Sequence, residues 1–226
     1  MSKIGRVDVP EARWEVQKAA ERYIAGYAAP HLVAAEDEQR AAKLVTLFGP
    51  DPAPEASIVV AAADDRGMLA GAAVIEPSVS DVLMSRDHAD ARKLAMTHRT
   101  LAALFVVPGA RGQGIGRQLL SEAAYWALPH GGRYLDGFVD DRNDSVDFYR
   151  SAGATVVGHN TGLPARPPTH FPLWHNPSVN GTWFYVDAWR LHQGLILCQR
   201  CQSVLEFVDE DGGDLRCPIC PPPPAQ

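Results

Sequence analysis

One short stretch of the chain, residues 104–117, limits the fold more strongly than any other. It reads LFVVPGARGQGIGR: an apolar run ends at Pro108, a corner rich in glycine and arginine follows, and a helix-like segment begins at Gly114. This order predicts a β-strand, a tight loop and the N-terminus of a helix. Glycines at positions 112, 114 and 116 leave room for a ligand against the backbone, and the N–H groups of the first helical turn would point at it. The stretch therefore predicts a binding site for an anion.

Two common anion loops do not fit this stretch. A Walker loop needs Gly-Lys-Ser/Thr, but Gly116 is followed by Arg117 and Gln118, and a dinucleotide fingerprint needs a third glycine where Arg117 or Leu119 stands. The run from Arg111 to Gly116 instead resembles the pyrophosphate loop of the GNAT N-acetyltransferase superfamily, Gln/Arg-x-x-Gly-x-Gly/Ala. For this motif taken alone, a glycine-rich turn that binds nothing is the simpler alternative.

A second motif supports the resemblance. Residues 143–154, NDSVDFYRSAGA, follow the strand-like run 134–139 and are similar to the next segment of the family, in which Asn opens a short helix, an aromatic residue and Tyr follow, and Gly closes it. The resemblance covers residues 58–189. It implies an α/β (α+β) GNAT fold, with a mixed, mostly antiparallel central sheet flanked by helices. It also implies acetyl-CoA, or a related acyl-CoA, as the co-substrate.

The resemblance assigns cofactor contacts to the strand and the loop. In the family, the strand before the pyrophosphate loop diverges from its neighbour, so Leu104 and Val106, with Phe105 between them, would offer N–H groups to the acyl carbonyl and the pantetheine arm. Such a group stabilises the charge that develops on the thioester oxygen by on the order of 3 kcal/mol. The pyrophosphate would lie on Arg111, Gly112, Gln113, Gly114, Ile115, Gly116 and Arg117. The alternative for the strand residues is a plain core role.

The second motif would supply the acid. Tyr149 would stand near the sulfur and protonate the leaving thiolate, because a phenol with a pKa of about 10 is only slightly less acidic than the thiol that forms. Asn143 would bond the pantetheine arm or cap the helix, for which Asp144 is equally suited. Alternatively, Phe148 and Tyr149 are an aromatic pair packed under the short helix.

The group that takes the proton from the amine is predicted from position. Glu76 ends one strand and His98 begins another, and we expect both near the acceptor entrance. We rank Glu76 first and His98 second. His170 and His175, in the proline-rich segment 163–180, and a relay of water molecules are the alternatives. A surface or packing role is the simpler interpretation of each of these side chains.

All four cysteines stand near the C-terminus, in two Cys-x-x-Cys pairs separated by fifteen residues. They are Cys198, Cys201, Cys217 and Cys220. This spacing resembles a zinc ribbon and predicts a structural Zn²⁺ bound by four thiolates, with no open position for catalysis. Between the pairs, residues 203–208 and Leu215 suggest a small hairpin that turns at residues 211–213. Ribbons often bind nucleic acid, but five acidic residues outnumber two arginines in residues 198–220, so a protein contact or a buttress for the fold is favoured.

Composition and charge limit the cellular compartment and the kinds of partner that we expect for this protein. The chain has 226 residues, 46% of them hydrophobic, and a formal net charge of -6, so it can build one ordinary core and a small appendage but offers no general basic field to nucleic acid or anionic membrane. No run approaches the ~18 apolar residues of a membrane helix, and the N-terminus lacks a signal-peptide core. We expect a cytoplasmic protein without a membrane partner, and a homodimer is compatible with this expectation.

The resemblance implies an acyltransferase domain, residues 1–192, and the pattern along the rest of the chain predicts a zinc ribbon, 193–220, and a proline-rich tail, 221–226. We expect strands at residues 4–7, 58–62, 69–76, 97–107, 134–139, 155–158 and 183–189, and helices at 10–30, 33–48, 114–127 and from 143. The polar segment 78–93 is expected to be a helix or flap near the acceptor side. Five prolines exclude the segment 163–180 from a sheet interior.

The predicted activity is transfer of an acyl group from acetyl-CoA to a primary amine, by direct attack in a ternary complex. The acceptor, a small molecule or a protein, stays open. The rival hypothesis is a non-catalytic acyl-CoA-binding or scaffold protein whose ribbon recruits a protein or nucleic-acid partner. A third hypothesis, modification of a nucleic acid or of a protein bound to one, predicts salt-sensitive retention on DNA or RNA.

Overall fold

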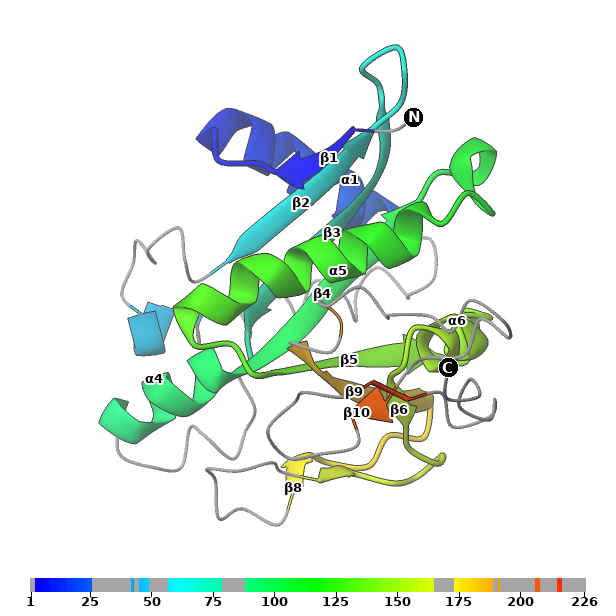
Figure 1. Cartoon of the computed structure of the whole chain (residues 1–226). Helices are drawn as coiled ribbons and strands as arrows, with labels where there is room; N and C mark the ends of the chain where they lie inside the picture. The colour runs from blue at the N-terminus through cyan, green and yellow to red at the C-terminus, as the bar shows by residue number, and fades with distance from the viewer. Residues whose placement is uncertain are drawn as a thin grey trace, which may run out of the picture.

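The central feature of the fold is a seven-stranded sheet with the strand order β1-β2-β3-β4-β5-β9-β6 (Figure 1). The computed structural model describes residues 3–25, 42, 45–48, 57–78, 88–164, 173–188, 191, 206–207 and 215–216. The strands are β1 (Lys3–Arg6), β2 (Ile58–Ala63), β3 (Leu69–Pro77), β4 (His98–Val106), β5 (Tyr134–Asp140), β6 (Thr155–Val156) and β9 (Gly181–Asp187). Every neighbouring pair is antiparallel except β4 and β5, which are parallel. The sheet is therefore mixed and mostly antiparallel, as predicted.

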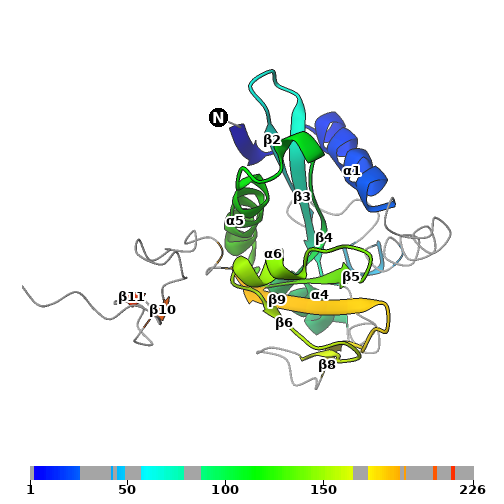
Figure 2. The same ribbon diagram turned by 90° about the vertical axis from the view of Figure 1, so that its right-hand side faces the viewer.

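Helices cover both faces of this sheet. They are α1 (Pro10–Ala25), α4 (His88–Thr97), α5 (Ile115–Ala127) and α6 (Val146–Ser151), with 3-10 turns η1 (Pro108–Ala110) and η2 (Leu128–His130). Figure 2 shows α5 and α1 on opposite sides of β2 and β3. Side chains alternate between the faces of a strand, so Val60 and Ile75 pack in the core beneath α5, whereas Val59 and Val74 pack in a second core beneath α1.

A third, smaller core lies on the face of the sheet away from α5. It joins α4 to a separate two-stranded sheet formed by β7 (Leu163–Pro164) and β8 (Leu173–His175). Its buried residues are Leu47, Ala91, Ala95, Leu163 and Trp174. Trp183 and Tyr185 of β9 pack against this core, whereas Phe184 between them belongs to the core of α5. The described residues of the proline-rich segment, 163–164 and 173–180, thus form strands only outside the central sheet, in agreement with the prediction from its prolines.

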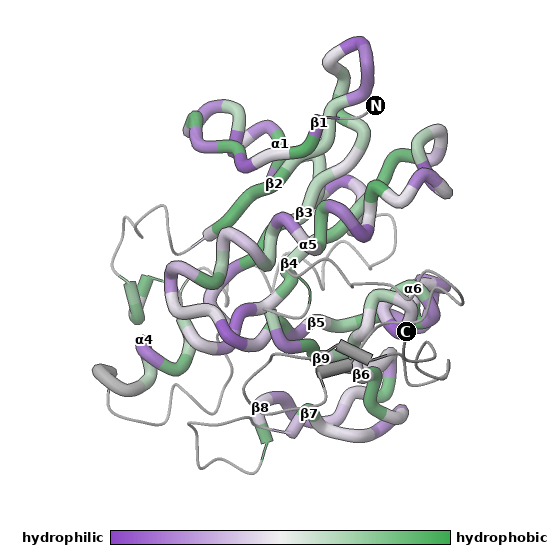
Figure 3. Tube along the Cα trace, viewed as in Figure 1, coloured by the Kyte–Doolittle hydropathy of each residue, from purple (hydrophilic) through white to green (hydrophobic). Residues whose placement is uncertain are grey.

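The hairpin between β2 and β3 turns at residues 64–67, as predicted. The Oδ1 atom of Asp64 accepts hydrogen bonds from the N–H groups of Arg66 (2.9 Å) and Met68 (2.8 Å). Gly67 has a φ of 75°, a left-handed conformation that glycine adopts without a Cβ penalty. Figure 3 shows this hydrophilic turn at the end of two largely hydrophobic strands.

The helix predicted to open at Asn143 begins at Val146 instead. The N–H group of Asn143 donates to the carbonyl oxygen of Asp140 (2.8 Å), and the N–H group of Ser145 donates to the carbonyl oxygen of Asn143 (2.8 Å). These bonds hold the segment in turns, so Ser145 occupies the N-cap position and Asn143 precedes the helix. The N-cap is therefore Ser145, and not Asn143 or Asp144 as predicted.

Parts of the predicted pattern lie outside the described residues. Most of the expected helix at 33–48 does, although residues 45–48 are helical, and so do residues 79–87 before α4. The hairpin predicted between the cysteine pairs is present as β10 (Glu206–Phe207) and β11 (Leu215–Arg216), which pair antiparallel. The four cysteines and the tail fall outside the described residues. In the part of the chain that the structure describes, no helix is long and apolar enough to cross a membrane.

Candidate active site

β4 and β5 diverge near the middle of the sheet. They pair only over His98–Thr100 of β4 and Tyr134–Asp136 of β5. Beyond this point β5 stays paired with β9 and β4 with β3. Ala102 is an extra residue in β4, because Ala103 faces Val74 whereas Leu101 faces Ile75. A bulge of this kind bends a strand, and here it lies where β4 leaves β5.

The backbone of β4 directs two predicted amides toward this divergence. The N–H group of Val107 donates to the carbonyl oxygen of Ala70, the residue before Gly71, at 2.9 Å. Amides alternate in direction along a strand, so the N–H groups of Leu104 and Val106 point away from β3, toward β5. Phe105 points its own amide at β3, and its ring stacks on Tyr23 of α1 with centroids 4.4 Å apart. The structure thus separates Phe105 from the other two predicted cofactor contacts.

The loop after β4 is a turn that presents backbone N–H groups. Gly112 and Gly114 have φ values of 75° and 78°, and an added Cβ on either would meet no atom within 4 Å. Gly114 is the N-cap of α5, and the first intrahelical bond runs from the N–H of Gln118 to the carbonyl oxygen of Gly114 (3.1 Å). Helix geometry therefore leaves the N–H groups of residues 115–117 without intrahelical acceptors, at the positive end of the helix dipole. Such an end binds an anion.

The loop residues differ in what their side chains contact. Arg111 donates from Nε to the carbonyl oxygen of Val106 (3.1 Å), which fixes the loop to the end of β4. Arg117 donates to the carbonyl oxygen of Ser151 (2.9 Å), and so joins α5 to the end of α6. Gln113 is exposed, whereas Ile115, the first residue of α5, is buried. A Cβ on Gly116 would lie 3.3 Å from the ring of Phe148, so this glycine brings α6 close to α5.

Tyr149 lies on the same face of the sheet as α5. Its ring stacks on Phe184 with centroids 4.0 Å apart and contacts Phe148 edge to face. The residue is 8% exposed, and burial raises the pKa of its phenol well above the ordinary value. The side chain therefore stays protonated at neutral pH. Asn143 is exposed, in the turn before α6.

This pKa shift predicts a loss of stability in alkali. The folded protein holds the Tyr149 proton more tightly than the unfolded chain, in which tyrosine titrates at a pH of about 10. The contribution to the free energy of unfolding is therefore complete below that pH and is lost as the pH rises above it. Denaturant titrations across this range should show a smaller loss in Y149F than in the wild type. Equal losses would contradict the assignment.

The opposite face of the sheet carries a row of polar residues across three strands. Glu76 of β3 faces Thr100 of β4, which in turn faces Asp136 of β5. Asp136 lies between core residues Leu135 and Gly137, and Leu135 packs in the core of α5, so Asp136 points to the other face. The carboxylate accepts hydrogen bonds from Thr100 Oγ1 (2.7 Å) and Ser78 Oγ (3.2 Å). This row of polar residues lies where β4 and β5 are still paired, just before the two strands diverge.

The two predicted bases have different surroundings. Glu76 is half-buried, with its Oε2 atom covered, at one end of the polar row. His98 is 3% exposed, its Nδ1 lies 3.4 Å from the carbonyl oxygen of Leu94, and its ring stacks on Trp174 with centroids 4.0 Å apart. These contacts give His98 a packing role and leave little of its ring accessible to an amine.

Sequence reasoning missed the most buried carboxylate of the site. Asp136 stands inside the apolar run 134–139, which we interpreted only as a strand. A charged residue within an internal strand costs free energy unless it is hydrogen-bonded. The presence of Asp136 in an apolar run was therefore the sequence signal that this residue has hydrogen-bond partners. His175 lies 3.2 Å from Asp136, although 39 positions separate the two residues.

The diverging strands, the amides of β4 and the adjoining helix N-terminus form a site suited to a ligand that combines a carbonyl with an anionic group. The chain belongs to the acetyltransferase (GNAT) family, whose family model matches residues 10–154. It is accordingly an acyl-CoA-dependent N-acetyltransferase, which transfers an acetyl group from acetyl-CoA to an amine.

Solved structures of acetyltransferases resemble this chain. An acetyltransferase from Streptococcus agalactiae has 11% sequence identity and a TM-score of 0.50, over 81% of this chain and 96% of that one. A GNAT superfamily phosphinothricin acetyltransferase from Sinorhizobium meliloti, in complex with acetyl-CoA, has 19% identity and a TM-score of 0.49, over 82% and 88%. A nourseothricin acetyltransferase has 25% identity and a TM-score of 0.41, over 62% and 68%. No curated protein sequence gives a significant match.

Proposed function

We propose that the chain transfers the acetyl group directly to a primary amine, in a ternary complex at the divergence of β4 and β5. One observation carries this proposal: Leu104 and Val106 direct their amides toward the divergence, and the same strand continues into the glycine loop before α5. The two features lie on one continuous strand–loop–helix segment. They match the two ends of an acyl-CoA, a thioester with its pantetheine arm and an anionic diphosphate.

The residues would then divide the work as follows. The amides of Leu104 and Val106 hold the acyl carbonyl and the pantetheine arm, and the N–H groups at the start of α5 hold the diphosphate. The lone pair of the amine forms the N–C bond, and the C–S bond breaks with its electron pair on sulfur. Tyr149 gives its proton to this sulfur and regains one from solvent. The nitrogen loses one proton to the acceptor face, where Glu76 lies.

The two-sided arrangement of the sheet supports these roles. Tyr149 belongs to the core beneath α5, whereas Glu76 and Asp136 lie in the polar row on the other face. An acid for the leaving thiolate and an acceptor for the amine proton are thus on opposite sides of the diverging strands. This separation suits a direct transfer, because the amine attacks from one side of the thioester while the sulfur departs toward the other.

A thiol-release assay tests the proposal. Purified protein is incubated with acetyl-CoA and a panel of amines that includes small amines, amino acids, amine-bearing antibiotics, and peptides with a free lysine or N-terminus. We expect at least one amine to release CoA thiol faster than the amine-free control. Binding of acetyl-CoA with no release for any amine would instead favour the non-catalytic acyl-CoA-binding protein.

For the C-terminal segment, residues 193–220, we propose a separate zinc ribbon in a cytoplasmic protein. The strands that follow the first cysteine pair and precede the second lie side by side, since Glu206 pairs with Arg216 and Phe207 with Leu215. Four thiolates with this spacing fit a tetrahedral Zn²⁺, and a reducing compartment keeps them from forming disulfides. The metal would stabilise a segment too short for its own core.

The ribbon predicts a metal content that can be measured. Elemental analysis of protein purified under reducing conditions should find one Zn²⁺ per chain, and the double variant C198S/C201S should have lost it. Acetyl-CoA affinity should be the same in both, because the cofactor residues lie in the first domain. Wild-type protein without zinc, or a variant that retains it, would contradict the ribbon.

A further inference from the structure

The carboxylate of Asp136 is the centre of a buried hydrogen-bond network at the end of the β4–β5 pairing. Its side chain is 3% exposed and has three partners from three other segments: Thr100 of β4, Ser78 after β3, and His175 of β8. Ser78 also accepts a hydrogen bond from the indole N–H of Trp174, which stacks on His98. A buried carboxylate with this many donors is held in one orientation.

The imidazole of His175 is fixed by two contacts. Its Nε2 atom lies 3.2 Å from Oδ1 of Asp136, and its ring stacks on Trp183 with centroids 4.1 Å apart and planes 6° apart. An ionised carboxylate can only accept a hydrogen bond, so Nε2 carries the hydrogen. In the neutral ring the other nitrogen, Nδ1, is then a proton acceptor. The side chain is 12% exposed, so the ring is not sealed from solvent.

Asp136 and His175, which we call the dyad, lie next to the divergence of β4 and β5, where the acetyl transfer is proposed to occur. Thr100 and Asp136 form the last pair between β4 and β5, and Ala102, the bulged residue, follows two positions later. Asp136 faces away from the core that contains Tyr149. The dyad and the proposed acid therefore approach the divergence from opposite faces of the sheet.

We propose that His175, oriented by Asp136, takes the proton that the acceptor amine loses on attack. This inference rests on the proposed acetyl transfer. The neutral amine attacks the acyl carbon with its lone pair, and the nitrogen, which is positively charged once the N–C bond forms, gives one proton to Nδ1 directly or through a water molecule. The C–S bond breaks with its electron pair on sulfur, which Tyr149 protonates. The imidazolium formed is stabilised by the carboxylate of Asp136 and returns its proton to solvent. His175 is the catalytic group, and Asp136 is a positioning residue that acts through it.

Other titratable groups share this face. Glu76 lies in the polar row, His98 is enclosed by Tyr134 and Trp174, and Tyr185 of β9 faces Asp136 in the strand register. Glu76 is the competing proton acceptor, because it lies on the same face and was predicted as the base. The experiment must therefore distinguish His175 from Glu76.

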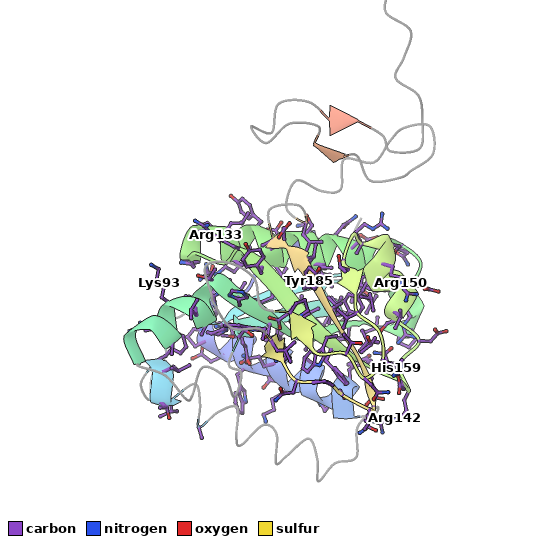
Figure 4. All side chains as sticks on the ribbon, turned by 90° about the horizontal axis from the view of Figure 1, so that it is seen from below. Lys93, Arg133, Arg142, Arg150, His159 and Tyr185 are labelled. Atoms are coloured by element: carbon purple, nitrogen blue, oxygen red, sulfur yellow. The ribbon has the colours of Figure 1, made fainter. Side chains whose placement is uncertain are left out.

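The test compares H175Q, D136N, E76Q and a matched control. Glutamine keeps a donor for Asp136 but cannot accept a proton as imidazole does. The control is H159Q, since His159 forms a similar pair with Asp141 (3.0 Å) but is 57% exposed. Figure 4 shows His159 at the edge of the molecule. For each variant, kcat/KM for the best amine is measured across pH, together with the Kd of acetyl-CoA.

We expect H175Q to lower kcat/KM by about 10²-fold and to remove the acidic limb of the pH profile, which imidazole groups produce between about pH 5 and 8. D136N should lower the rate less and shift that limb, and H159Q should match the wild type. Acetyl-CoA affinity should be unchanged in all four variants, which also verifies that each is folded.

Several results would overturn the dyad. Wild-type kcat/KM and pH profile in H175Q would remove His175 as the base, and loss of the acidic limb in E76Q alone would assign the step to Glu76. If H175Q does not fold, D136N decides, because an unchanged rate and profile there contradict the role of the pair. If the wild type itself is inactive, the proposed function fails. If the wild type is active and H175Q is equally active, only the role of the dyad fails.

Discussion

Replacing Gly114 with valine is expected to abolish tight binding of acetyl-CoA. Gly114 has a φ of 78° and is the N-cap of α5, directly before the N–H groups that would hold the diphosphate. A β-branched residue is a conformational outlier at this φ, and its methyl groups would stand in the open space beside those N–H groups. We expect the Kd measured by calorimetry to rise by at least about 100-fold, or about 2.7 kcal/mol.

The matched control for this variant is G67V. Gly67 has a φ of 75° and the same open space around an added Cβ, but it lies in the β2–β3 turn. Both variants should be destabilised by similar backbone strain, so thermal unfolding is measured for each. Only G114V should lose binding. Equal affinity in G114V and the wild type, or equal losses in the two variants, would show that the loop does not hold the cofactor.

Replacing Tyr149 with phenylalanine is expected to lower turnover while leaving cofactor affinity unchanged. The phenylalanine ring can keep the stack on Phe184 and the edge contact with Phe148, so the local packing survives. The lost hydroxyl is the proton source for the leaving thiolate, an effect of about 10²-fold or more on kcat. Steady-state thiol release gives kcat, and calorimetry gives the Kd of acetyl-CoA.

A second tyrosine provides the comparison for Y149F. Tyr125 lies on α5 and is 42% exposed, and it has no assigned role, so Y125F should keep the wild-type kcat. Turnover in Y149F equal to that of Y125F would remove Tyr149 as the acid. A parallel fall in affinity and turnover would instead show that the residue holds the cofactor or the fold.

The strand, loop and helix start of the proposed cofactor site could be predicted from sequence because their signals are local. The strand, the glycine corner and the first turn of α5 occupy consecutive residues, and each has a direct backbone reason: positive φ at Gly112 and Gly114, and free N–H groups at a helix start. The helix α6 was predicted from its motif, but its start was predicted too early. Hydrogen bonds in the turn at Asn143 place the N-cap at Ser145.

The polar network that we propose for the acceptor side could not be predicted in the same way, because its contacts join distant parts of the chain. Asp136 meets Ser78 across 58 positions and His175 across 39. No periodicity or motif encodes such a meeting, which depends on the sheet order and on β8 folding over the sheet. Glu76 and His98 were chosen by strand position, and that rule cannot distinguish a residue in the polar row from one enclosed by aromatic rings.

The most direct test of the whole account is a calorimetric titration of the wild-type chain with acetyl-CoA. The account predicts saturable binding at one site per chain, by the amides of β4 and the N-terminus of α5. No heat with acetyl-CoA or with longer acyl-CoA thioesters, over a range of temperatures and with protein shown to be folded, would contradict it.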